Sequence, residues 1–254
     1  MSSVSSSEAG GYIKQKIKNM KTEIQYFSNI NDLSQRAAEK ILAVSKKCVE
    51  EKGYFTFVLS GGETPKTLYK LLGQEPLSSQ IPWEKTYLFW GDERCVAPDH
   101  VDSNYGLAHG ILLNKVSIPE KNVYRIKGEL SGKEAAVDYK KDIIFFLKDK
   151  KKKNFDLILL GLGSDGHTAS LFPGYVFSEK DSDVEAVYAP EGKPPGERVT
   201  LTLSLINSAE NVIFLVSDKK KEMVLSEVLK GNKSYPAALV KAQDSLKWFI
   251  EKVR

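Results

Sequence analysis

The sequence predicts an α/β protein built on an open, mostly parallel β-sheet with helices on both of its faces. Short apolar runs rich in β-branched and aromatic residues alternate with segments in which apolar residues recur at helical spacing. Several runs are apolar at nearly every position, which is typical of strands buried on both faces of a parallel sheet. The clearest of these runs are 54–59, 156–160 and 211–216.

The remaining strands are weaker but keep the same alternation with helices. A first, edge-type strand is expected at 23–27, and a strand-like segment closes the chain at 246–250. The turn at 190–196, rich in proline and glycine, separates two further strands. Besides the buried runs, strands are expected at 23–27, 86–90, 122–126, 184–189, 198–203 and 246–250.

Capping residues set the expected helix limits. Asn31 or Asp32 caps a first helix, which ends at Gly53. Thr64 caps a second, with Pro65 at its first helical position. A helix capped by Ser103 and helices at 66–72, 133–150, 167–171 and 219–229 complete the prediction.

Length and composition favour one globular domain. The 254 residues are 41% hydrophobic and 28% charged, which is ordinary for a protein with a packed core. Residues 1–21 are expected to be a disordered extension because the segment has neither the apolar stretch of a signal peptide nor enough charge for a transit peptide. Residues 22–254 are expected to form a single α/β domain.

Charge and cysteine content exclude several classes of protein. The net charge of +4 arises from 37 basic and 33 acidic residues, a mild excess that does not favour nucleic acid binding. Cys48 and Cys95 lack the spacing of a zinc site or of a disulfide framework, so we expect no metal and a reducing compartment, the cytoplasm. No apolar run is long enough to span a bilayer.

Three polar or glycine-rich loops follow the carboxyl ends of three expected strands. They are 60–65, 92–94 and 161–167. Ligands of open parallel sheets bind outside these ends, where neighbouring loops diverge. One such loop alone is most simply a turn, but three on one sheet edge predict a binding site.

The third loop combines a glycine pattern with a histidine. Its pattern from Gly161 to Gly166 matches a dinucleotide-binding fingerprint only weakly, because no clean strand end with an acidic residue follows at the right distance. The nucleophile elbow of serine hydrolases is absent because Leu162 takes the place of its first glycine. His167 is the candidate general base, since a helix start favours a neutral imidazole, and Asp165 is placed to orient it.

Basic residues elsewhere provide an anion site. Arg94 follows two carboxylates, and Arg198 opens a strand. Lys219, Lys220 and Lys221 begin a helix, where cations are unfavourable unless an anion is near. Arginine supplies bidentate geometry and lysine a point charge, so this set predicts phosphate binding.

Four motifs together resemble the 6-phosphogluconolactonase family. They are Ser-Gly-Gly-Glu-Thr-Pro at 60–65, Trp-Gly-Asp-Glu-Arg at 90–94 with Ser103-Asn104, the segment 161–173, and Pro-Pro-Gly-Glu-Arg-Val-Thr-Leu-Thr at 194–202. The resemblance runs from about residue 23 to 251. It implies a fold shared with glucosamine-6-phosphate deaminases, and hydrolysis of 6-phosphoglucono-δ-lactone in the oxidative pentose phosphate pathway without a cofactor or metal.

The resemblance also implies roles for individual residues. His167 looks like the base that activates water, with Asp165 and Arg94 as its catalytic partners. Three alternatives remain: a glucosamine-6-phosphate deaminase or isomerase, a non-catalytic sugar-phosphate sensor and, more distantly, a nicotinamide-dependent dehydrogenase. A monomer or weak dimer is expected. The residues implied to contact or orient the sugar phosphate are Ser60, Gly61, Gly62, Thr64, Asp92, Arg198 and Lys221.

Overall fold

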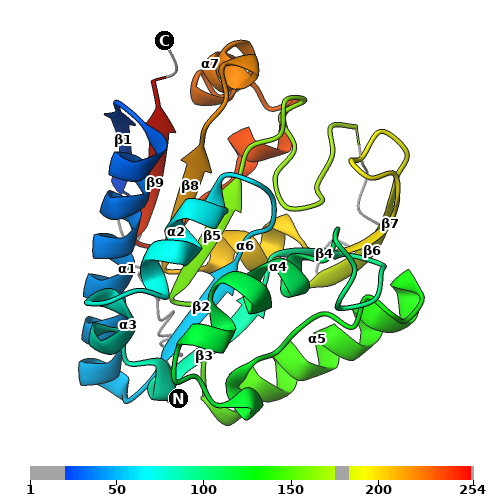
Figure 1. Ribbon diagram of the computed structural model, residues 1–254. Coiled ribbons are helices and arrows are strands. Elements are labelled where there is room, and N and C mark those ends of the chain that lie inside the picture. Colours follow the sequence, from blue (N-terminus) through cyan, green and yellow to red (C-terminus); the bar gives the residue numbers. More distant parts are fainter. Residues whose placement is uncertain (1–20, 175–182, 253–254) are drawn as a thin grey trace, which may run out of the picture.

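Six parallel strands form the central sheet of the protein. The computed structural model describes residues 21–174 and 183–252, so the expected extension at 1–21 lies outside it except for Lys21, which begins the first strand. The strand order is β1–β9–β8–β5–β2–β3, and every neighbouring pair is parallel (Figure 1). This confirms the predicted fold class. The strands are β1 (Lys21–Phe27), β2 (Phe55–Leu59), β3 (Thr86–Trp90), β5 (Leu157–Gly161), β8 (Asn211–Val216) and β9 (Ser245–Glu251).

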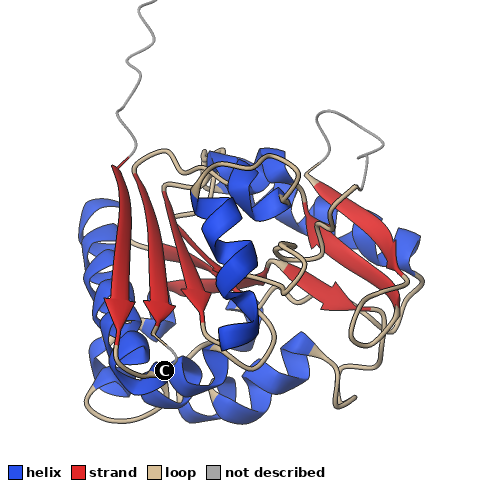
Figure 2. Cartoon of the chain, turned by 90° about the horizontal axis from the view of Figure 1, so that it is seen from above, coloured by secondary structure: helices blue, strands red, loops and turns tan. Residues whose placement is uncertain are grey.

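Helices cover both faces of this sheet, as Figures 1 and 2 show. Every residue of β2 is buried, as are 157–160 of β5, so these strands form the centre of the core. No helix among the described residues is both long and apolar enough to cross a lipid bilayer. The helices are α1 (Ile30–Lys52), α2 (Pro65–Leu72), α3 (Leu77–Gln80), α4 (Asn104–Ile111), α5 (Gly132–Asp149), α6 (Leu203–Ser208) and α7 (Glu222–Leu229).

Two of the expected caps differ from the structure. The cap of α1 is Asn29, whose side chain accepts the N–H groups of Asn31 and Asp32, the two residues predicted for that role. Thr64 precedes Pro65 as expected, but its side chain makes no capping hydrogen bond. The expected helix at 219–229 begins with a 3-10 turn, η4 (Lys219–Lys221), before α7.

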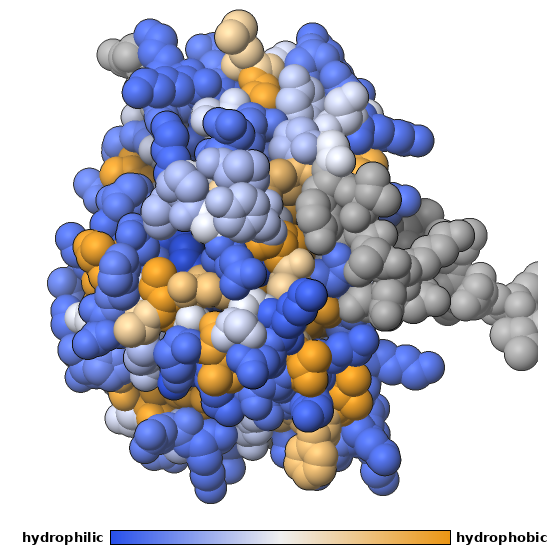
Figure 3. All heavy atoms as spheres, turned by 90° about the vertical axis from the view of Figure 1, so that its right-hand side faces the viewer, coloured by the Kyte–Doolittle hydropathy of each residue, from blue (hydrophilic) through white to orange (hydrophobic). Residues whose placement is uncertain are grey.

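A second, smaller sheet was not predicted as such. Its order is β4–β7–β6, with β4 at Asp92–Arg94, β7 at Gly196–Leu201 and β6 at Val184–Ala189, all antiparallel. The segment 92–94 is therefore a short strand rather than a loop. Its pairing places Arg94 directly opposite Arg198. Figure 3 shows the side of the molecule that carries this sheet, where hydrophilic residues dominate and apolar ones lie in small, scattered groups.

Two expected elements are absent. Residues 122–126 form no strand, because the segment leaves a 3-10 turn, makes one bridge from Val123 to Leu88, and turns again at Gly128. Residues 167–171 form no helix. Ala169 has a left-handed φ of 48°, and Thr168 and Leu171 bond each other's backbone across a tight turn, which no α-helix permits.

The connections of the sheet fix where a ligand can bind. From β2 the chain moves to β3 on one side, and from β5 it moves through β8 and β9 on the other. The strand order therefore reverses between β2 and β5. Loops leaving two such strands diverge and open a crevice beyond their carboxyl ends.

Candidate active site

A pocket of about 220 Å³ occupies this crevice at the carboxyl ends of β2 and β5. The three loops predicted to meet at this edge do meet there, together with Lys221 of η4 and Arg198 of β7. Asp165 does not line the pocket directly, but it contacts His167, which does. The other predicted residues that line it are Ser60, Gly61, Gly62, Thr64, Asp92, Arg94, Arg198 and Lys221.

The first loop is held by a tyrosine from the helix that follows it. The backbone N–H of Ser60 donates to the hydroxyl of Tyr69 at 3.0 Å, and that hydroxyl donates to the carbonyl of Ser60 at 2.6 Å. Tyr69 is fully buried, and burial raises its pKa, so it remains a neutral donor. Gly62 has φ of 89°, a conformation that glycine adopts at little cost. The loop thus presents backbone to the pocket.

His167 and Asp165 form a close pair on the third loop. Nδ1 of His167 lies 2.5 Å from Oδ1 of Asp165, which also accepts the backbone N–H of His167 at 3.1 Å. Burial acts to raise the pKa of Asp165, but the hydrogen bond and charge of His167 outweigh it and hold that pKa below its ordinary value. An ionised Asp165 retains the proton on Nδ1 of His167. This leaves Nε2 as the nitrogen with a free lone pair.

This arrangement corrects the reason given for His167. With no helix at 167–171, the imidazole has no helix dipole beside it, and the carboxylate of Asp165 orients the ring instead. The ring also lies beside that of Phe172, with centroids 4.7 Å apart and the planes tilted by 37°. The sequence therefore identified the pair, although it assigned the wrong local structure to it.

Two glycines of the third loop make room for protein groups. A Cβ at position 163 would lie 2.1 Å from Nδ1 of His167 and 2.6 Å from Oδ1 of Asp165. A Cβ at Gly166 would lie 2.2 Å from the ring of Tyr235, and Gly166 also has a left-handed φ of 84°. Both glycines therefore have a local explanation. They clear space for the histidine pair and for a neighbouring ring.

Asp92 joins two of the loops from below the pocket. It is buried, and its Oδ2 accepts the hydroxyl of Ser170 at 2.6 Å. Its backbone carbonyl accepts Nδ2 of Asn104 at 2.9 Å, and its Oδ1 accepts the same nitrogen at 3.4 Å. Asp92 therefore orients protein groups, in line with the orienting role that the resemblance implies.

Glu93 is a structural residue of the site that the sequence prediction missed. It is buried, and its Oε1 accepts the N–H groups of Arg94 at 2.8 Å and Asn104 at 2.7 Å. Its Oε2 accepts the Ser103 hydroxyl at 3.0 Å and the N–H of Tyr105 at 2.7 Å. Burial raises its pKa, and these backbone hydrogen bonds oppose that effect. Its position between Asp92 and Arg94, eleven residues before a helix start, is the signal that identifies it in retrospect.

Two arginines, Arg94 of β4 and Arg198 of β7, lie directly opposite each other in the small sheet. Arg94 donates to the carbonyls of Asp102 and Lys193, and Arg198 donates to that of Pro194 at 2.8 Å. The Nε atoms of both arginines are buried and have no hydrogen-bond partner among the described residues. Burial lowers the pKa of Arg198, and the charge of Arg94 adds to this effect while Asp92 opposes it. Two adjacent cations with unused donors are suited to an anionic ligand.

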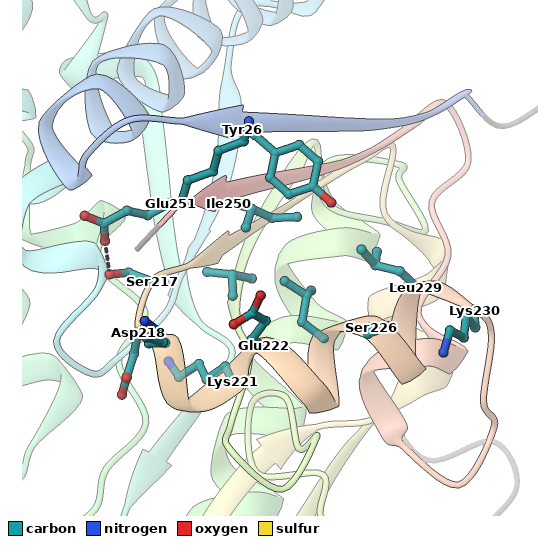
Figure 4. Close-up of a pocket in the computed structure, with 14 residues that line it drawn as sticks. Tyr26, Ser217, Asp218, Lys221, Glu222, Ser226, Leu229, Lys230, Ile250 and Glu251 are labelled. Carbon is teal, nitrogen blue, oxygen red and sulfur yellow. Dashed lines mark hydrogen bonds between the residues drawn. The ribbon is translucent and has the colours of Figure 1, made fainter. Parts of the chain in front are cut away.

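Lys221 lines this pocket and also a larger cavity of about 490 Å³ beside α7. Figure 4 shows that cavity between α7 and the ends of β1, β8 and β9, with Tyr26, Glu222 and Glu251 around it. It contains neither histidine nor arginine, so the smaller pocket holds the reactive groups. Burial lowers the pKa of Lys221, and Asp218 opposes this shift.

Neither metal nor disulfide chemistry has a visible basis in the described residues. Within 21–174 and 183–252, no three His, Cys, Asp or Glu side chains are arranged to hold a metal ion. Cys48 and Cys95 are both free, and burial raises the pKa of each thiol to about 11. Such thiols are poor nucleophiles at neutral pH.

The sequence and the fold match known proteins. A profile of the glucosamine-6-phosphate isomerase/6-phosphogluconolactonase family matches residues 28–248. The chain belongs to this family. It is 37% identical to 6-phosphogluconolactonase 3, chloroplastic, of Arabidopsis thaliana, over 92% of this chain and 75% of the relative. It is also 37% identical to 6-phosphogluconolactonase of Synechocystis sp., over 91% of this chain and 96% of the relative. The crystal structure of 6-phosphogluconolactonase from Thermotoga maritima superposes with a TM-score of 0.79 at 33% identity, covering 91% of this chain and all of that one.

Two acidic residues, Glu63 of the first loop and Asp218 beside Lys221, lie near the basic groups of the site. Glu63 forms an ion pair with Lys66 on the next turn of chain. Asp218 has a left-handed φ of 100°, and its Oδ1 accepts the N–H of Lys220 at 3.0 Å. Each carboxylate is therefore engaged by a local partner.

Proposed function

We propose that this protein hydrolyses 6-phosphoglucono-δ-lactone to 6-phosphogluconate, the reaction for which its relatives are named. The observation that carries the proposal is the His167–Asp165 pair, which faces a pocket flanked by Arg94, Arg198 and Lys221. One free imidazole nitrogen beside several cations suits a neutral reacting group attached to an anionic phosphate. A lactone phosphate has both features.

His167 is the general base in this mechanism. Its Nε2 takes a proton from a water molecule as the water oxygen attacks the lactone carbonyl carbon. Asp165 stabilises the imidazolium that forms, because its carboxylate lies 2.5 Å from Nδ1. Positioned bases of this kind contribute roughly 10²- to 10⁴-fold to rate.

Arg198 is assigned to the reacting carbonyl and Arg94 to the phosphate. The guanidinium carbon of Arg198 lies 5.8 Å from the centroid of Phe172, the ring that also contacts His167. Arg198 is thus close to the same ring as the base, whereas Arg94 donates to the carbonyl of Asp102, farther along its own loop, and to that of Lys193, in the turn before β7. A fixed cation near the carbonyl stabilises the oxyanion that develops there. The backbone N–H groups of Gly61 and Gly62 and the Nζ of Lys221 complete the phosphate contacts.

The second half of the reaction returns the proton. The tetrahedral intermediate collapses, the bond between the carbonyl carbon and the ring oxygen breaks, and the imidazolium of His167 protonates the departing ring oxygen. The carboxylic acid so formed loses its proton to solvent. The net change is one water consumed, and His167 ends as a neutral base.

A lactone hydrolysis assay, corrected for spontaneous opening, tests the proposal. The wild-type protein should accelerate hydrolysis, and His167→Ala should lower kcat by about 10³-fold, within the range for a lost general base. His109→Ala is the matched control, because His109 lies on α4 and does not line the pocket. Near-normal turnover in a folded His167→Ala variant would contradict the assignment.

The rival reaction on this fold is the release of ammonia from glucosamine 6-phosphate. Proton shuttling in that reaction calls for further carboxylates after the histidine, whereas residues 168–174 contain none. The same preparation should therefore release no ammonia from glucosamine 6-phosphate. Rapid ammonia release without lactonase activity would reverse the preference.

Cytoplasmic location and a monomeric or weakly dimeric state form part of the same proposal. The free cysteines suit a reducing compartment. The scattered distribution of apolar residues in Figure 3 suits a protein without a large permanent interface on that face. Cell fractionation and analytical ultracentrifugation test the two statements. A plastid location, like that in the name of the Arabidopsis relative, or a stable higher oligomer would contradict them.

A further inference from the structure

The carboxylate of Asp165 fixes only one atom of the His167 ring. Its Oδ1 lies 2.5 Å from Nδ1, and the side chain of His167 is 31% exposed. A single hydrogen bond sets the position of Nδ1 but allows the ring plane to rotate about the line that joins the two atoms. A catalytic group works only within about 0.5 Å and 10–20° of its productive geometry. A second contact is therefore needed to fix the plane of the imidazole.

The ring of Phe172 supplies this contact. Its centroid lies 4.7 Å from that of His167, and the two planes are tilted by 37°. Aromatic rings attract at separations of about 4.5–7 Å when they are not stacked squarely face to face. The guanidinium carbon of Arg198 lies 5.8 Å from the centroid of the same phenyl ring. Phe172 thus contacts both the base and the cation assigned to the reacting carbonyl.

A tight turn explains how Phe172 reaches the base. Five residues separate the two, and on an α-helix of 3.6 residues per turn they would point about 140° apart. The chain turns instead, because the N–H of Leu171 donates to the carbonyl of Thr168 at 2.9 Å and the hydroxyl of Ser170 donates to Asp92 at 2.6 Å. Leu171 is fully buried, which anchors the residue directly before Phe172. The turn that replaces the expected helix therefore returns the phenyl ring to the imidazole.

We propose that Phe172 is a positioning residue of the reaction, whose ring fixes the plane of the His167 imidazole so that Nε2 faces the pocket. This inference rests on the proposed lactonase function and adds to it a residue that does not line the pocket. The same ring keeps the base in a constant position relative to Arg198, so that proton removal and charge stabilisation act on one substrate pose. Loss of the ring should slow the chemical step and leave binding unchanged.

Steady-state lactone hydrolysis by three variants of Phe172 tests this proposal. Phe172→Leu and Phe172→Met keep an apolar side chain without the planar ring, and kcat should fall about tenfold in both, less than the roughly 10²-fold cost of a full 1 Å misplacement. KM, and the affinity for 6-phosphogluconate measured by calorimetry, should change by less than about twofold, the pattern of a lost contribution to the transition state alone. Phe172→Tyr keeps the ring and should retain most of the wild-type kcat.

Tyr105→Leu is the matched control. Tyr105 is half-buried like Phe172, and its ring centroid lies 5.7 Å from that of His109 with the same tilt of 37°. The guanidinium carbon of Arg125 lies 5.4 Å from the Tyr105 ring. The substitution therefore removes an aromatic ring that contacts a histidine and an arginine outside the pocket, and kcat should stay close to that of the wild type.

The pattern across these variants decides the proposal. Wild-type kcat in a folded Phe172→Leu or Phe172→Met protein would show that the ring does not position the base. An equal loss in Phe172→Tyr, or a rise in KM that accounts for the loss in all three variants, would also overturn the proposal. Thermal melts confirm that each variant is folded. Absence of lactonase activity in the wild type would instead contradict the proposed function.

Discussion

Gly163→Ala should disable the histidine pair without altering its two side chains. The added Cβ would lie 2.1 Å from Nδ1 and 2.3 Å from Cε1 of His167, and 2.6 Å from Oδ1 of Asp165. Ordinary contacts of a Cβ begin at 3.4 Å. The ring must therefore move by about 1.3 Å, from 3.4 minus 2.1. No left-handed φ is recorded at Gly163, so the backbone itself accepts alanine.

A displacement of this size can be converted into a rate. A misplacement of about 1 Å in a reacting geometry costs on the order of 10²-fold. That factor corresponds to about 2.7 kcal/mol in the activation barrier, at roughly 1.4 kcal/mol for each tenfold. We expect kcat to fall by about 10²-fold. KM should change little, because the added methyl group lies beside the base and not beside Arg94 or Lys221.

Steady-state lactone hydrolysis measures both parameters, and circular dichroism with thermal melts confirms folding. Ser164→Ala is the control, because this neighbouring residue is exposed and its side chain has no hydrogen bond to another described residue. Wild-type kcat in a folded Gly163→Ala protein would show that the position of His167 does not limit the rate. The placement of the base would then have to be reconsidered.

Two further predictions concern the supports of the site. Glu93→Gln replaces one carboxylate oxygen by an NH₂ group that faces two donors, which should destabilise the fold by about 1–3 kcal/mol and lower Tm by several degrees. Glu129→Gln, on the surface, should have a smaller effect. An unchanged melt of Glu93→Gln would refute the supporting role of Glu93. Because burial lowers the pKa of Lys221, its cation is lost at a lower pH than that of an ordinary lysine, and affinity for 6-phosphogluconate should fall as pH rises through that value. Lys221→Arg retains its charge and should remove this alkaline loss, as measured by calorimetry; the same loss in both proteins would exclude Lys221 as its source.

The sequence predicted those parts of the site that depend on strand ends. Once 54–59 and 156–160 are recognised as buried parallel strands, the loops that follow them must lie on one edge, and Ser60 and His167 meet there. The prediction failed where tertiary contacts decide the local structure. The segment 167–171 has helix-compatible residues, but Thr168 donates its hydroxyl to Gly161 at 2.9 Å and Ser170 bonds Asp92, so the chain turns instead.

The supporting residues were missed for a related reason. Glu93 and Asn104 are eleven positions apart and meet only because the loop between them closes. Residues 92–94 carry three charged side chains and lack a strand-like pattern, yet they pair with β7 because that strand is available beside them. The cap of α1 is Asn29 rather than Asn31 or Asp32; all three residues have capping chemistry, so their identity alone does not show which one caps the helix. Sequence pattern alone does not distinguish these choices.

The corrected local structure makes the reactivity of His167 depend on one short loop. A helix dipole would have acted whatever the neighbouring side chains were, whereas orientation by Asp165 requires that both residues keep their relative position. The loop secures this position by internal and external bonds: the N–H of Gly163 donates to the carbonyl of His167 at 2.8 Å, and the carbonyl of Gly166 accepts the N–H of Ala237 at 3.2 Å. Because each bond involves backbone, most side-chain changes in the loop leave it intact. Substitution of its space-making glycines does not, and the proposed proton transfer therefore depends on these glycines as well as on the histidine.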